Sequence, residues 1–307
     1  MRLIIDTDAG IDDAIALMLA LRQPGVRVEA ITTVCGNVAL DKVIRNVFTV
    51  LDAMGADVPV YAGAAQPLVA PWSAESVHGA DGLGNYDDRP PTTRRVEAEH
   101  AAHALVRLAN TYPGELTLVA LAPHTNLALA TRLDPTFPAK IKDFIFMGGT
   151  IEGNGNTDNI AAEWNIYCDP EAAHITLESF PHSRMLSWET TLLHALSMVQ
   201  FHELAAHKTP SGVFFERINR HFLTIMGTAL VPEGYLLADS LAMAIALQPS
   251  LVTEHQSRYV AVELHGTHSR GQTVIDHRGR LRRTPNVDIV TRVDMVQVYA
   301  MLKAMLA

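Results

Sequence analysis

The stretch RLIIDTDAGIDDAIALMLAL, residues 2–21, decides the fold prediction, because a short apolar run meets a crowd of carboxylates. Residues 3–5 have the composition of a buried strand, and the apolar residues after the acids recur with the spacing of a helix. Four acids fall within eight positions: Asp6, Asp8, Asp12 and Asp13. Like charges at close range raise one another's pKa and cost free energy unless a cation or a proton compensates them. Either these side chains separate into water, or a positive group lies among them.

Strand-like and helix-like segments alternate along the first half of the chain. Strands are predicted at 2–5, 26–34, 58–62, 115–121 and 141–149, and helices at 12–23, 39–55, 97–113 and 126–133. Such alternation favours right-handed crossovers between parallel strands. The predicted fold class is therefore α/β, with an open, mostly parallel, Rossmann-like sheet flanked by helices.

The pattern changes after residue 190, where a mainly helical insertion precedes short C-terminal strands at 258–266, 272–276 and 286–294. Neither an internal repeat nor a low-complexity linker interrupts the chain, so we predict one domain over 1–307. The segments 71–93 and 200–235 resemble insertions that could cover a site.

The charge balance is acidic, with a formal net charge of −9 and a single basic run, RGRLRR at 278–283, which suits a solvated loop or hairpin. Nucleic acid and membranes are therefore not predicted as partners. The only cysteines are Cys35 and Cys168, so no disulfide framework is implied and a reducing compartment fits. With neither a signal peptide nor an apolar run of membrane-spanning length, we predict a cytoplasmic location.

Open parallel sheets bind ligands at the carboxyl ends of their strands. The acids follow the first strand, Asn37 follows the second, and Leu121 and Met147 lie where two later strands end. We therefore expect these residues to meet at one edge of the sheet.

The acids allow two interpretations. Asp12 and Asp13 open a helix, where carboxylates cap free N–H groups. Capping does not account for Asp6 and Asp8, so a metal site is the preferred interpretation. Oxygen-only ligands indicate Ca²⁺ or Mg²⁺ rather than zinc, and Gly10 comes too early for an EF-hand loop.

A second polar cluster lies in GNGNTDNIAAEWNIYCDPEAAH, residues 153–174. It contains Asn154, Asn156, Asn159, Glu163 and Asn165, side chains of the kind that bind sugar hydroxyls. The alternative is an ordinary Asn- and Gly-rich turn. Glu163 and Asn165 stand two apart on an extended segment and would point to the same side, which favours a binding edge. Further along, Asp239 begins an apolar helix, where it could equally be a cap.

Six motifs, IIDTDAGIDDAIAL, ITTVCGN, LVALAPHTNLALA, FMGG, AAEWNIYCDPEAAH and ADSLAMAIAL, together resemble the nucleoside hydrolases of the inosine-uridine preferring family. They occur in the family's order and span residues 1–250. The resemblance implies Ca²⁺-dependent hydrolysis of the N-glycosidic bond of ribonucleosides to ribose and free base, and an assembly that is a homodimer or homotetramer.

The resemblance also implies roles for individual residues. Asp8, Asp13 and Asp239 resemble the side-chain ligands of Ca²⁺, and the Leu121 carbonyl resembles a main-chain ligand. Asp12 matches the general base that takes a proton from the metal-bound water. The positions that match contacts to the ribose are Asn37, Met147, Asn156, Glu163 and Asn165. The match at Asn156 is the loosest, because its spacing to Glu163 is one residue longer than expected, and Asp6 resembles an acid behind the ligands that orients the site.

The sequence departs from the family at Ala238, where many members have a histidine that protonates the leaving base. His78 in VHGADGLGN is our candidate for that role, although a histidine in a Gly-rich loop can also be plain surface. Trp72, Trp188 and Tyr235 could stack on the base, or could be core residues. Base preference therefore stays open.

Two other functions compete with hydrolysis. A haloacid dehalogenase-type phosphohydrolase also has an Asp-x-Asp after its first strand, but it needs a downstream lysine that the chain lacks at a convincing place. A non-catalytic ribose- or nucleoside-binding protein is compatible with the missing histidine, but has no use for Asp12 beside an activated water.

Overall fold

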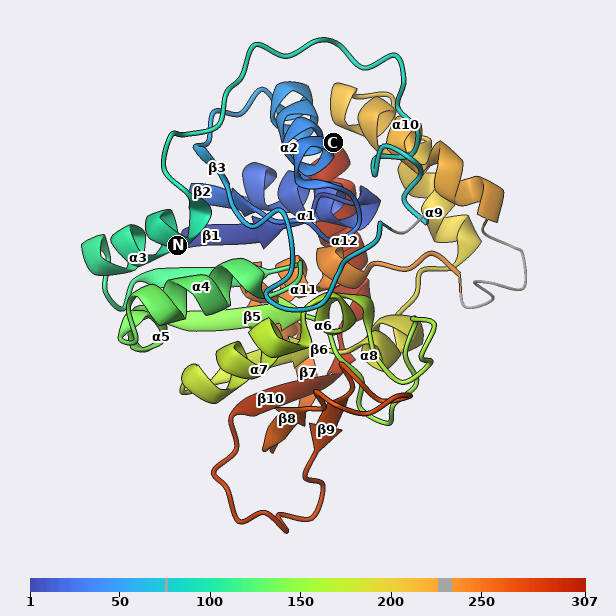
Figure 1. The fold of residues 1–307 in the computed structure, drawn as a ribbon. Helices are drawn as coiled ribbons and strands as arrows, with labels where there is room; N and C mark the ends of the chain where they lie inside the picture. The colour runs from blue at the N-terminus through green and yellow to red at the C-terminus, as the bar shows by residue number, and fades with distance from the viewer. Residues whose placement is uncertain (75–76, 226–233) are drawn as a thin grey trace.

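The central sheet of the protein has eight strands and positions everything that follows (Figure 1). The structure, a computed structural model, describes residues 1–74, 77–225 and 234–307. The strands are β1 (Arg2–Thr7), β2 (Arg27–Thr33), β3 (Val60–Ala62), β4 (Leu116–Ala120), β5 (Asp143–Met147), β6 (Ser183–Leu186), β7 (Val252–Arg258) and β10 (Val287–Val293). Their order is β3-β2-β1-β4-β5-β6-β10-β7, and neighbours run parallel except for the edge strand β7, which is antiparallel to β10.

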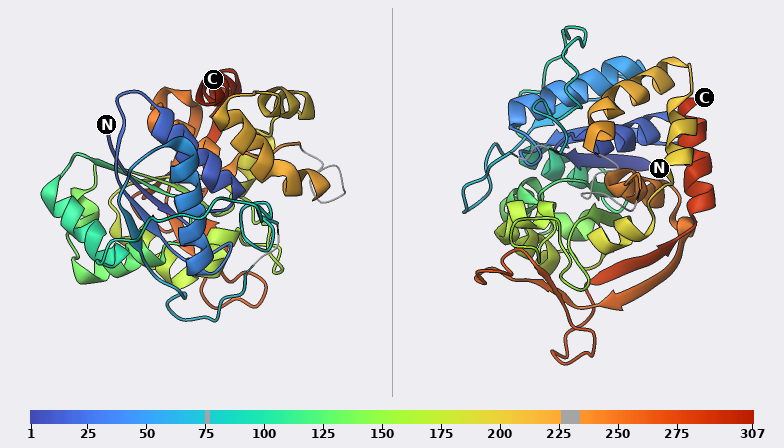
Figure 2. Two further views of the ribbon diagram at one scale, coloured as in Figure 1. Left: turned by 90° about the horizontal axis from the view of Figure 1, so that it is seen from above. Right: turned by 90° about the vertical axis from the view of Figure 1, so that its right-hand side faces the viewer.

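Helices cover both faces of this sheet, as Figure 1 and Figure 2 show. One face packs against α1 (Ile11–Arg22), α2 (Leu40–Met54), α9 (Met198–Ala205), α10 (Pro210–Ile225), α11 (Ala238–Leu247) and α12 (Met295–Leu306). The other packs against α3 (Ala101–Thr111), α4 (Thr125–Leu133), α5 (Phe137–Lys140) and α7 (Pro170–Ser179). Successive side chains of a strand point to opposite faces, so Leu3 and Ile5 join the first core and Ile4 the second.

The remaining elements lie around the edges. They are α6 (Trp164–Cys168), α8 (Trp188–Leu193), the 3₁₀ turn η1 (Pro249–Leu251), and the strands β8 (Val260–Val262) and β9 (Thr273–Ile275), which form a separate two-stranded sheet. Within the described ranges, no helix combines the length and the apolar character needed to cross a bilayer.

The predicted α/β architecture is confirmed, with three local differences. β6 was not predicted, because its four residues are too few to show a periodicity. β7 was missed because it is an edge strand whose central residues are exposed, so that it lacks apolar alternation. The strand predicted over 258–266 is shorter than expected: Val260–Val262 forms β8, which belongs to the second sheet, and Arg258 is the last residue of β7.

The strand order reverses between β1 and β4, since the chain runs outward from β1 to β3 and then returns to the other side of β1. Crevices at such reversal points are where open α/β sheets bind their ligands. The carboxyl ends of β1 and β4 are the ends that carry the acids and Leu121.

Candidate active site

The turn from β1 into α1 is built around Asp13. Ala9 takes up a left-handed conformation, with φ of 44°. This brings the Thr7 hydroxyl and the Gly10 N–H to the Asp13 carboxylate, which accepts a hydrogen bond from each. Asp13 therefore caps α1 as the simpler interpretation proposed, and it faces the other acids as well.

Asp12, Asp13 and Asp239 each bring one carboxylate oxygen into a cluster whose members lie within 4.8 Å of one another. Asp239 arrives on the first turn of α11, which packs along α1, and Ser240 Oγ donates to the Asp12 carbonyl at 3.3 Å. Burial, followed by repulsion from Asp12, raises the pKa of Asp239 well above its usual value. The fold thus gathers negative charge that a cation would neutralise.

Asp8 lies next to this cluster and is fully buried. One of its oxygens accepts a hydrogen bond from the Asn37 N–H at 2.7 Å, whereas Oδ1 has no partner in the described part of the chain. Burial and the neighbouring Asp13 raise the Asp8 pKa. Gly36 must be glycine here, because a Cβ would lie 2.0 Å from Asp8 Oδ2. A buried carboxylate oxygen without a donor, among other acids, fits an oxygen-ligand site for a hard cation.

Asn165 joins the ends of β4 and β5. Its Nδ2 donates to the carbonyl oxygens of Leu121, at 3.0 Å, and Met147, at 3.2 Å. Its Oδ1 makes no hydrogen bond to another described residue and is available to a ligand.

Glu163 is the N-cap of α6. Its oxygens accept hydrogen bonds from the N–H groups of Asn165 at 3.0 Å and Gly149 at 2.9 Å. Burial raises its pKa to about 7. Asn156 is tied to the same helix, because its Oδ1 accepts from the Trp164 N–H at 2.9 Å.

Asp6 supports the site from behind. Its Oδ1 accepts hydrogen bonds from Thr32 Oγ1 and from Asn126 Nδ2, the latter at 2.8 Å. Asn126 also donates to the Thr33 carbonyl and accepts from the Ala64 N–H. The group therefore links the ends of β1, β2 and β3 with the start of α4, and burial raises the pKa of Asp6 to about 7.

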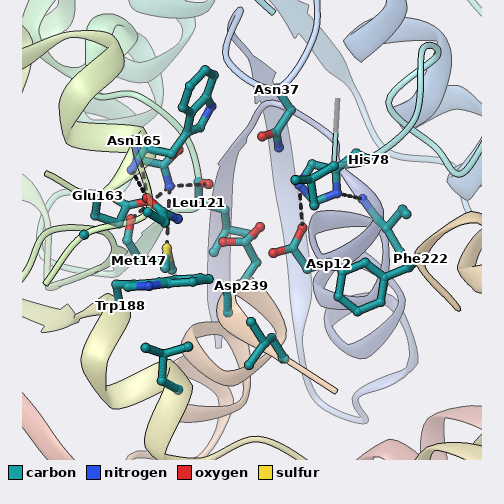
Figure 3. Close-up of a pocket in the computed structure, with 18 of the residues that line it drawn as sticks. Asp12, Asn37, His78, Leu121, Met147, Glu163, Asn165, Trp188, Phe222 and Asp239 are labelled. Atoms are coloured by element: carbon teal, nitrogen blue, oxygen red, sulfur yellow. Dashed lines mark hydrogen bonds and ion pairs between the residues drawn. The ribbon is translucent and has the colours of Figure 1, made fainter. Parts of the chain in front are cut away.

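A cavity of about 490 Å³ opens above the acids (Figure 3). Twelve residues singled out from the sequence line it: Asp12, Asn37, His78, Leu121, Met147, Asn154, Asn156, Glu163, Asn165, Trp188, Tyr235 and Asp239. In Figure 3, Glu163 and Asn165 lie on one side of Asp239, and Asp12, His78 and Phe222 lie on the other. Asp8, Asp13 and Asp6 are not part of this lining; they are fully buried.

His78 is oriented by the first turn of α1. Its Nδ1 accepts a hydrogen bond from the Ile11 N–H at 3.2 Å, and its Nε2 lies 3.8 Å from Asp12 Oδ1. In the neutral ring the proton is therefore on Nε2, the nitrogen that lies near Asp12.

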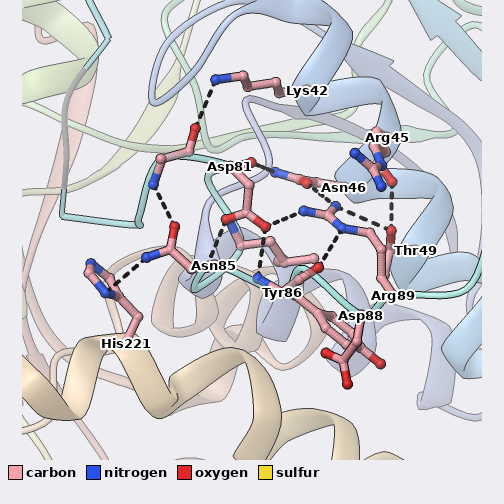
Figure 4. A network of polar contacts seen from close by, with 12 residues as sticks. Lys42, Arg45, Asn46, Thr49, Asp81, Asn85, Tyr86, Asp88, Arg89 and His221 are labelled. Carbon is pink, nitrogen blue, oxygen red and sulfur yellow. Dashed lines mark hydrogen bonds and ion pairs between the residues drawn. The ribbon is translucent and has the colours of Figure 1, made fainter.

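A buried polar clamp holds the loop that carries His78 (Figure 4). The Arg89 side chain is 2% exposed, forms an ion pair with Asp81 and donates to Asn46 Oδ1 at 2.6 Å. Asn46 Nδ2 in turn donates to the carbonyls of Ala9 and Asp81, each at 3.0 Å. The loop of His78 and the acidic turn are thereby fastened to the same residue of α2.

The three aromatic residues proposed to contact a base are placed differently. Trp188 lines the cavity. Tyr235 also lines it but is 2% exposed, and its hydroxyl donates to Asn219 Oδ1 at 2.7 Å. Trp72 is not among the lining residues; its indole N–H donates to the Gly36 carbonyl at 2.7 Å, and it supports the turn that packs on Asp8.

Sequence reasoning did not single out several other lining residues as site residues: Ile11, Val77, Gly155, Trp164, Leu192, Asn219, Phe222 and Leu236. Most are apolar, and nothing in the sequence distinguishes them from core residues. Five of them lie in segments that the sequence marked: Val77 in 71–93, Asn219 and Phe222 in 200–235, and Gly155 and Trp164 in the second polar cluster. Residues 75–76 and 226–233 of these segments lie outside the described residues.

The sequence was compared with protein families and with related proteins. The family model of the inosine-uridine preferring nucleoside hydrolases matches residues 3–300. The non-specific ribonucleoside hydrolase RihC of Salmonella enteritidis PT4 is 36% identical over 297 residues, covering 96% of this chain and 94% of that protein. Uridine nucleosidase 1 of Arabidopsis thaliana is 35% identical over 278 residues, covering 90% and 82%.

Solved structures agree with these sequence matches. The plant nucleoside hydrolase PpNRh1 superposes with a TM-score of 0.92 at 33% identity, covering 99% of this chain and 98% of that one. An inosine-guanosine nucleoside hydrolase superposes with a TM-score of 0.93 at 34% identity over the same shares.

Proposed function

The chain belongs to the inosine-uridine preferring nucleoside hydrolase family, and from this premise we propose that it hydrolyses ribonucleosides to ribose and free base with Ca²⁺ and Asp12 as general base. The observation that carries the proposal is the acid cluster beneath the cavity, in which Asp12 is the least buried member and lines the substrate space. Family membership removes the haloacid dehalogenase-type alternative.

The proposed cation site consists of Asp8, Asp13 and Asp239 with the Leu121 carbonyl. Its support is the donor set, which contains only oxygens, together with Asp8 Oδ1, which has no hydrogen-bond partner in the described ranges. When bound, Ca²⁺ would neutralise these acids and make a nearby water molecule more acidic. Asp12 would take a proton from a water molecule that attacks the anomeric carbon.

The polar side of the cavity is suited to hold the ribose. Among the described residues, nothing forms a hydrogen bond with the Asn165 amide oxygen or the Asn156 amide nitrogen, and Glu163 offers a carboxylate fixed by backbone N–H groups. Asn37 and Met147 complete the proposed set of contacts. A ring held by its hydroxyls beside Asp12 makes the reaction effectively intramolecular. The surrounding carboxylates stabilise the positive charge that develops on the ribose as the glycosidic bond breaks.

His78 is the proposed acid for the leaving base. The Ile11 N–H occupies its Nδ1, so a proton on Nε2 can be donated to a base nitrogen. Ala238 leaves the alternative family position without a donor. Trp188 and Tyr235 are proposed to contact the base as apolar walls.

The described lining contains Asp12, Glu163 and Asp239 but no Lys or Arg. A phosphate at the 5′ position would meet carboxylates and no cationic side chain there. This supports nucleosides rather than nucleotides as substrates.

The other features stay predictions. One domain over 1–307 is supported by the family match across 3–300. A cytoplasmic location is supported by the two free, buried cysteines. A homodimer or homotetramer rests on the family resemblance, and light scattering behind a size-exclusion column measures it directly.

The decisive experiment is Asp12→Asn assayed on a panel of purine and pyrimidine nucleosides. Asp12 Oδ1 has no hydrogen bond to another described residue, so the amide breaks no internal hydrogen bond there. We expect kcat to fall by roughly 10²- to 10⁴-fold, the usual contribution of a general base, with little change in Ca²⁺ affinity. Asp41→Asn, at the exposed start of α2, is the matched control.

Metal removal completes the test. Treatment with EDTA should abolish ribose release, and Ca²⁺ should restore it better than Mg²⁺. A wild-type protein that binds Ca²⁺ and nucleosides without releasing ribose would instead identify a binding protein. A kcat for Asp12→Asn within tenfold of wild type would remove Asp12 from the mechanism.

A further inference from the structure

A second cavity lies outside the substrate site, between α2 and the loop that follows His78 (Figure 4). Its volume is about 210 Å³, and it shares no lining residue with the substrate cavity. Five charged side chains line it: Lys42, Arg45, Asp81, Asp87 and Arg89. The described lining of the substrate cavity, by contrast, has carboxylates and no Lys or Arg. The charge of this second cavity therefore decides which ligands it suits.

Arg89 and Asp81 neutralise each other. They form the ion pair of the clamp, and Arg89 Nε also donates to the Tyr86 carbonyl at 3.0 Å. The Asp81 carboxylate accepts further hydrogen bonds from the N–H groups of Leu83, Asn85 and Tyr86, at 2.8 to 2.9 Å. This pair is therefore a fixed part of the wall, and the other three charged side chains set the charge of the cavity.

Lys42 and Arg45 form no ion pair with a carboxylate of the described residues. They stand three positions apart on α2, so both lie on the same face of the helix. Lys42 Nζ donates to the Ala80 carbonyl at 2.8 Å, which uses one of its three protons. The Arg45 guanidinium is exposed and makes no hydrogen bond within the described ranges. Both side chains therefore have donors left for a ligand.

The lining of this cavity has an excess of positive charge. Burial lowers the pKa of Arg89, and repulsion from Arg45 adds to that effect against the attraction of Asp81. The remaining acid, Asp87, is exposed and forms no ion pair in the part of the chain that the structure describes. Lys42 and Arg45 thus outweigh Asp87, and an anion would compensate the difference.

The size and the donors of the cavity indicate the class of anion. A volume of about 210 Å³ holds several water molecules, and a tetrahedral oxyanion can take the place of a few of them. A guanidinium fork and an ammonium group bind phosphate and sulfate through charge-assisted hydrogen bonds. The cavity is therefore suited to an ion of that class.

The wall of the cavity leads directly to the substrate site. Ala80, whose carbonyl accepts from Lys42, is two residues from His78. A bound anion would lie against Lys42 while Lys42 holds Ala80, and it would offset the repulsion that acts on Arg89. Because Arg89 fastens the same loop, both effects stabilise the position of His78.

We propose that Lys42 and Arg45 form a binding site for a small tetrahedral oxyanion of the phosphate and sulfate class, and that its occupant stabilises the loop that carries His78. The site is separate from the substrate cavity, and the proposal does not depend on the proposed function.

The first test is isothermal titration calorimetry of the Ca²⁺-loaded protein with sodium sulfate, with sodium chloride at the same ionic strength as reference. We expect saturable binding with a Kd of roughly 1 mM, as suits a site with few contacts. Arg45→Ala should raise the Kd about tenfold, the loss of one charge-assisted hydrogen bond. Asp87→Asn, which removes an acid from the lining, should lower it by roughly 2- to 3-fold.

The matched control is Arg132→Ala, because Arg132 is an exposed arginine in the last turn of α4, away from the cavity. Its Kd for sulfate should equal that of wild type. Both arginine variants should have the wild-type midpoint of thermal unfolding without sulfate, since neither side chain has a hydrogen-bond partner in the described ranges.

Hydrogen exchange tests the effect on the loop. At a sulfate concentration ten times the Kd, the amides of residues 80–89 should exchange up to roughly tenfold more slowly in wild type. In Arg45→Ala the same addition should leave their exchange nearly unchanged.

Methyl phosphate, titrated in the same way, distinguishes the source of the anion. Binding tighter than that of sulfate would identify a phosphate ester as the occupant, and equal binding a free oxyanion; either supports the site if Arg45→Ala weakens it. Absence of saturable binding of both probes, or the same Kd in Arg45→Ala as in Arg132→Ala, would overturn the site. Binding that leaves exchange in 80–89 unchanged would overturn its effect on the loop.

Discussion

Replacing His124 with leucine should make the stability of the protein less sensitive to acid. His124 lies in the turn between β4 and α4, is fully buried, and has no hydrogen-bond partner for either ring nitrogen in the described ranges. Its ring packs edge-on against Phe144 and Phe146, at centroid distances of 5.8 and 5.0 Å. Burial lowers its pKa from 6.5 to about 3.

The sign and size of the effect follow from these pKa values. Below pH 6.5 the unfolded chain binds a proton at His124, whereas the folded protein binds it only below about pH 3. Above pH 6.5 His124 is neutral in both the folded and the unfolded state and costs no stability. As the pH falls below 6.5, the unfolded state binds a proton that the folded state does not, so the free energy of unfolding decreases. Between pH 7 and pH 4.5 the two pKa values give a loss of about 2.5 kcal/mol from this residue.

The assay is urea unfolding of wild type and His124→Leu at pH 7 and pH 4.5, both with EDTA so that metal binding does not contribute. The other titrating groups cancel in the comparison, and the variant should lose about 2.5 kcal/mol less than wild type between the two pH values. The exposed His268→Leu is the control. Identical losses in His124→Leu and wild type would refute the reasoning, because they would mean that His124 takes up its proton while folded.

Three further predictions concern the site. His78→Ala should lower kcat on nucleosides by roughly 10²-fold but leave 4-nitrophenyl riboside, whose leaving group needs no acid, nearly unaffected; equal losses on both would exclude the acid role. Arg89→Met should remove the clamp on the loop of His78, and steady-state kinetics should show little additional loss of kcat when it is combined with His78→Ala. Asn165→Asp would place an oxygen against the carbonyls of Leu121 and Met147; urea unfolding at pH 7 should show roughly 2–3 kcal/mol less stability, and an unchanged midpoint would contradict the hydrogen bonds described.

The part of the site that the sequence predicted best is formed by residues at the carboxyl ends of the strands. Asp12, Asn37, Leu121 and Met147 follow apolar strands, and parallel strands bring their carboxyl ends to one edge, so their meeting could be deduced without coordinates. The position of Asp239 on α11 could not, because nothing local to ADSLAMAIAL says which helix it packs against. The family resemblance, and not the periodicity, predicted that Asp239 joins the other acids.

The wall of the cavity was the hardest part to predict. Phe222 and Asn219 lie on α10, whose spacing of apolar residues identifies a helix but not the part of the sheet edge that it covers. Glu189 was equally hidden, because an acid in the first turn of a short helix is ordinary. Its carboxylate accepts hydrogen bonds from three N–H groups of residues 151–154, a relation that only the tertiary structure contains.

The packing of α11 along α1 determines when the acid cluster can form during synthesis of the chain. Asp13 and Asp239 lie far apart along the chain, and their carboxylates meet only after these two helices have docked. A growing polypeptide on the ribosome thus has an incomplete set of acids until translation has passed α11. Products truncated before α11 lack Asp239, so they should neither bind a cation at this acid cluster nor release free base from nucleosides.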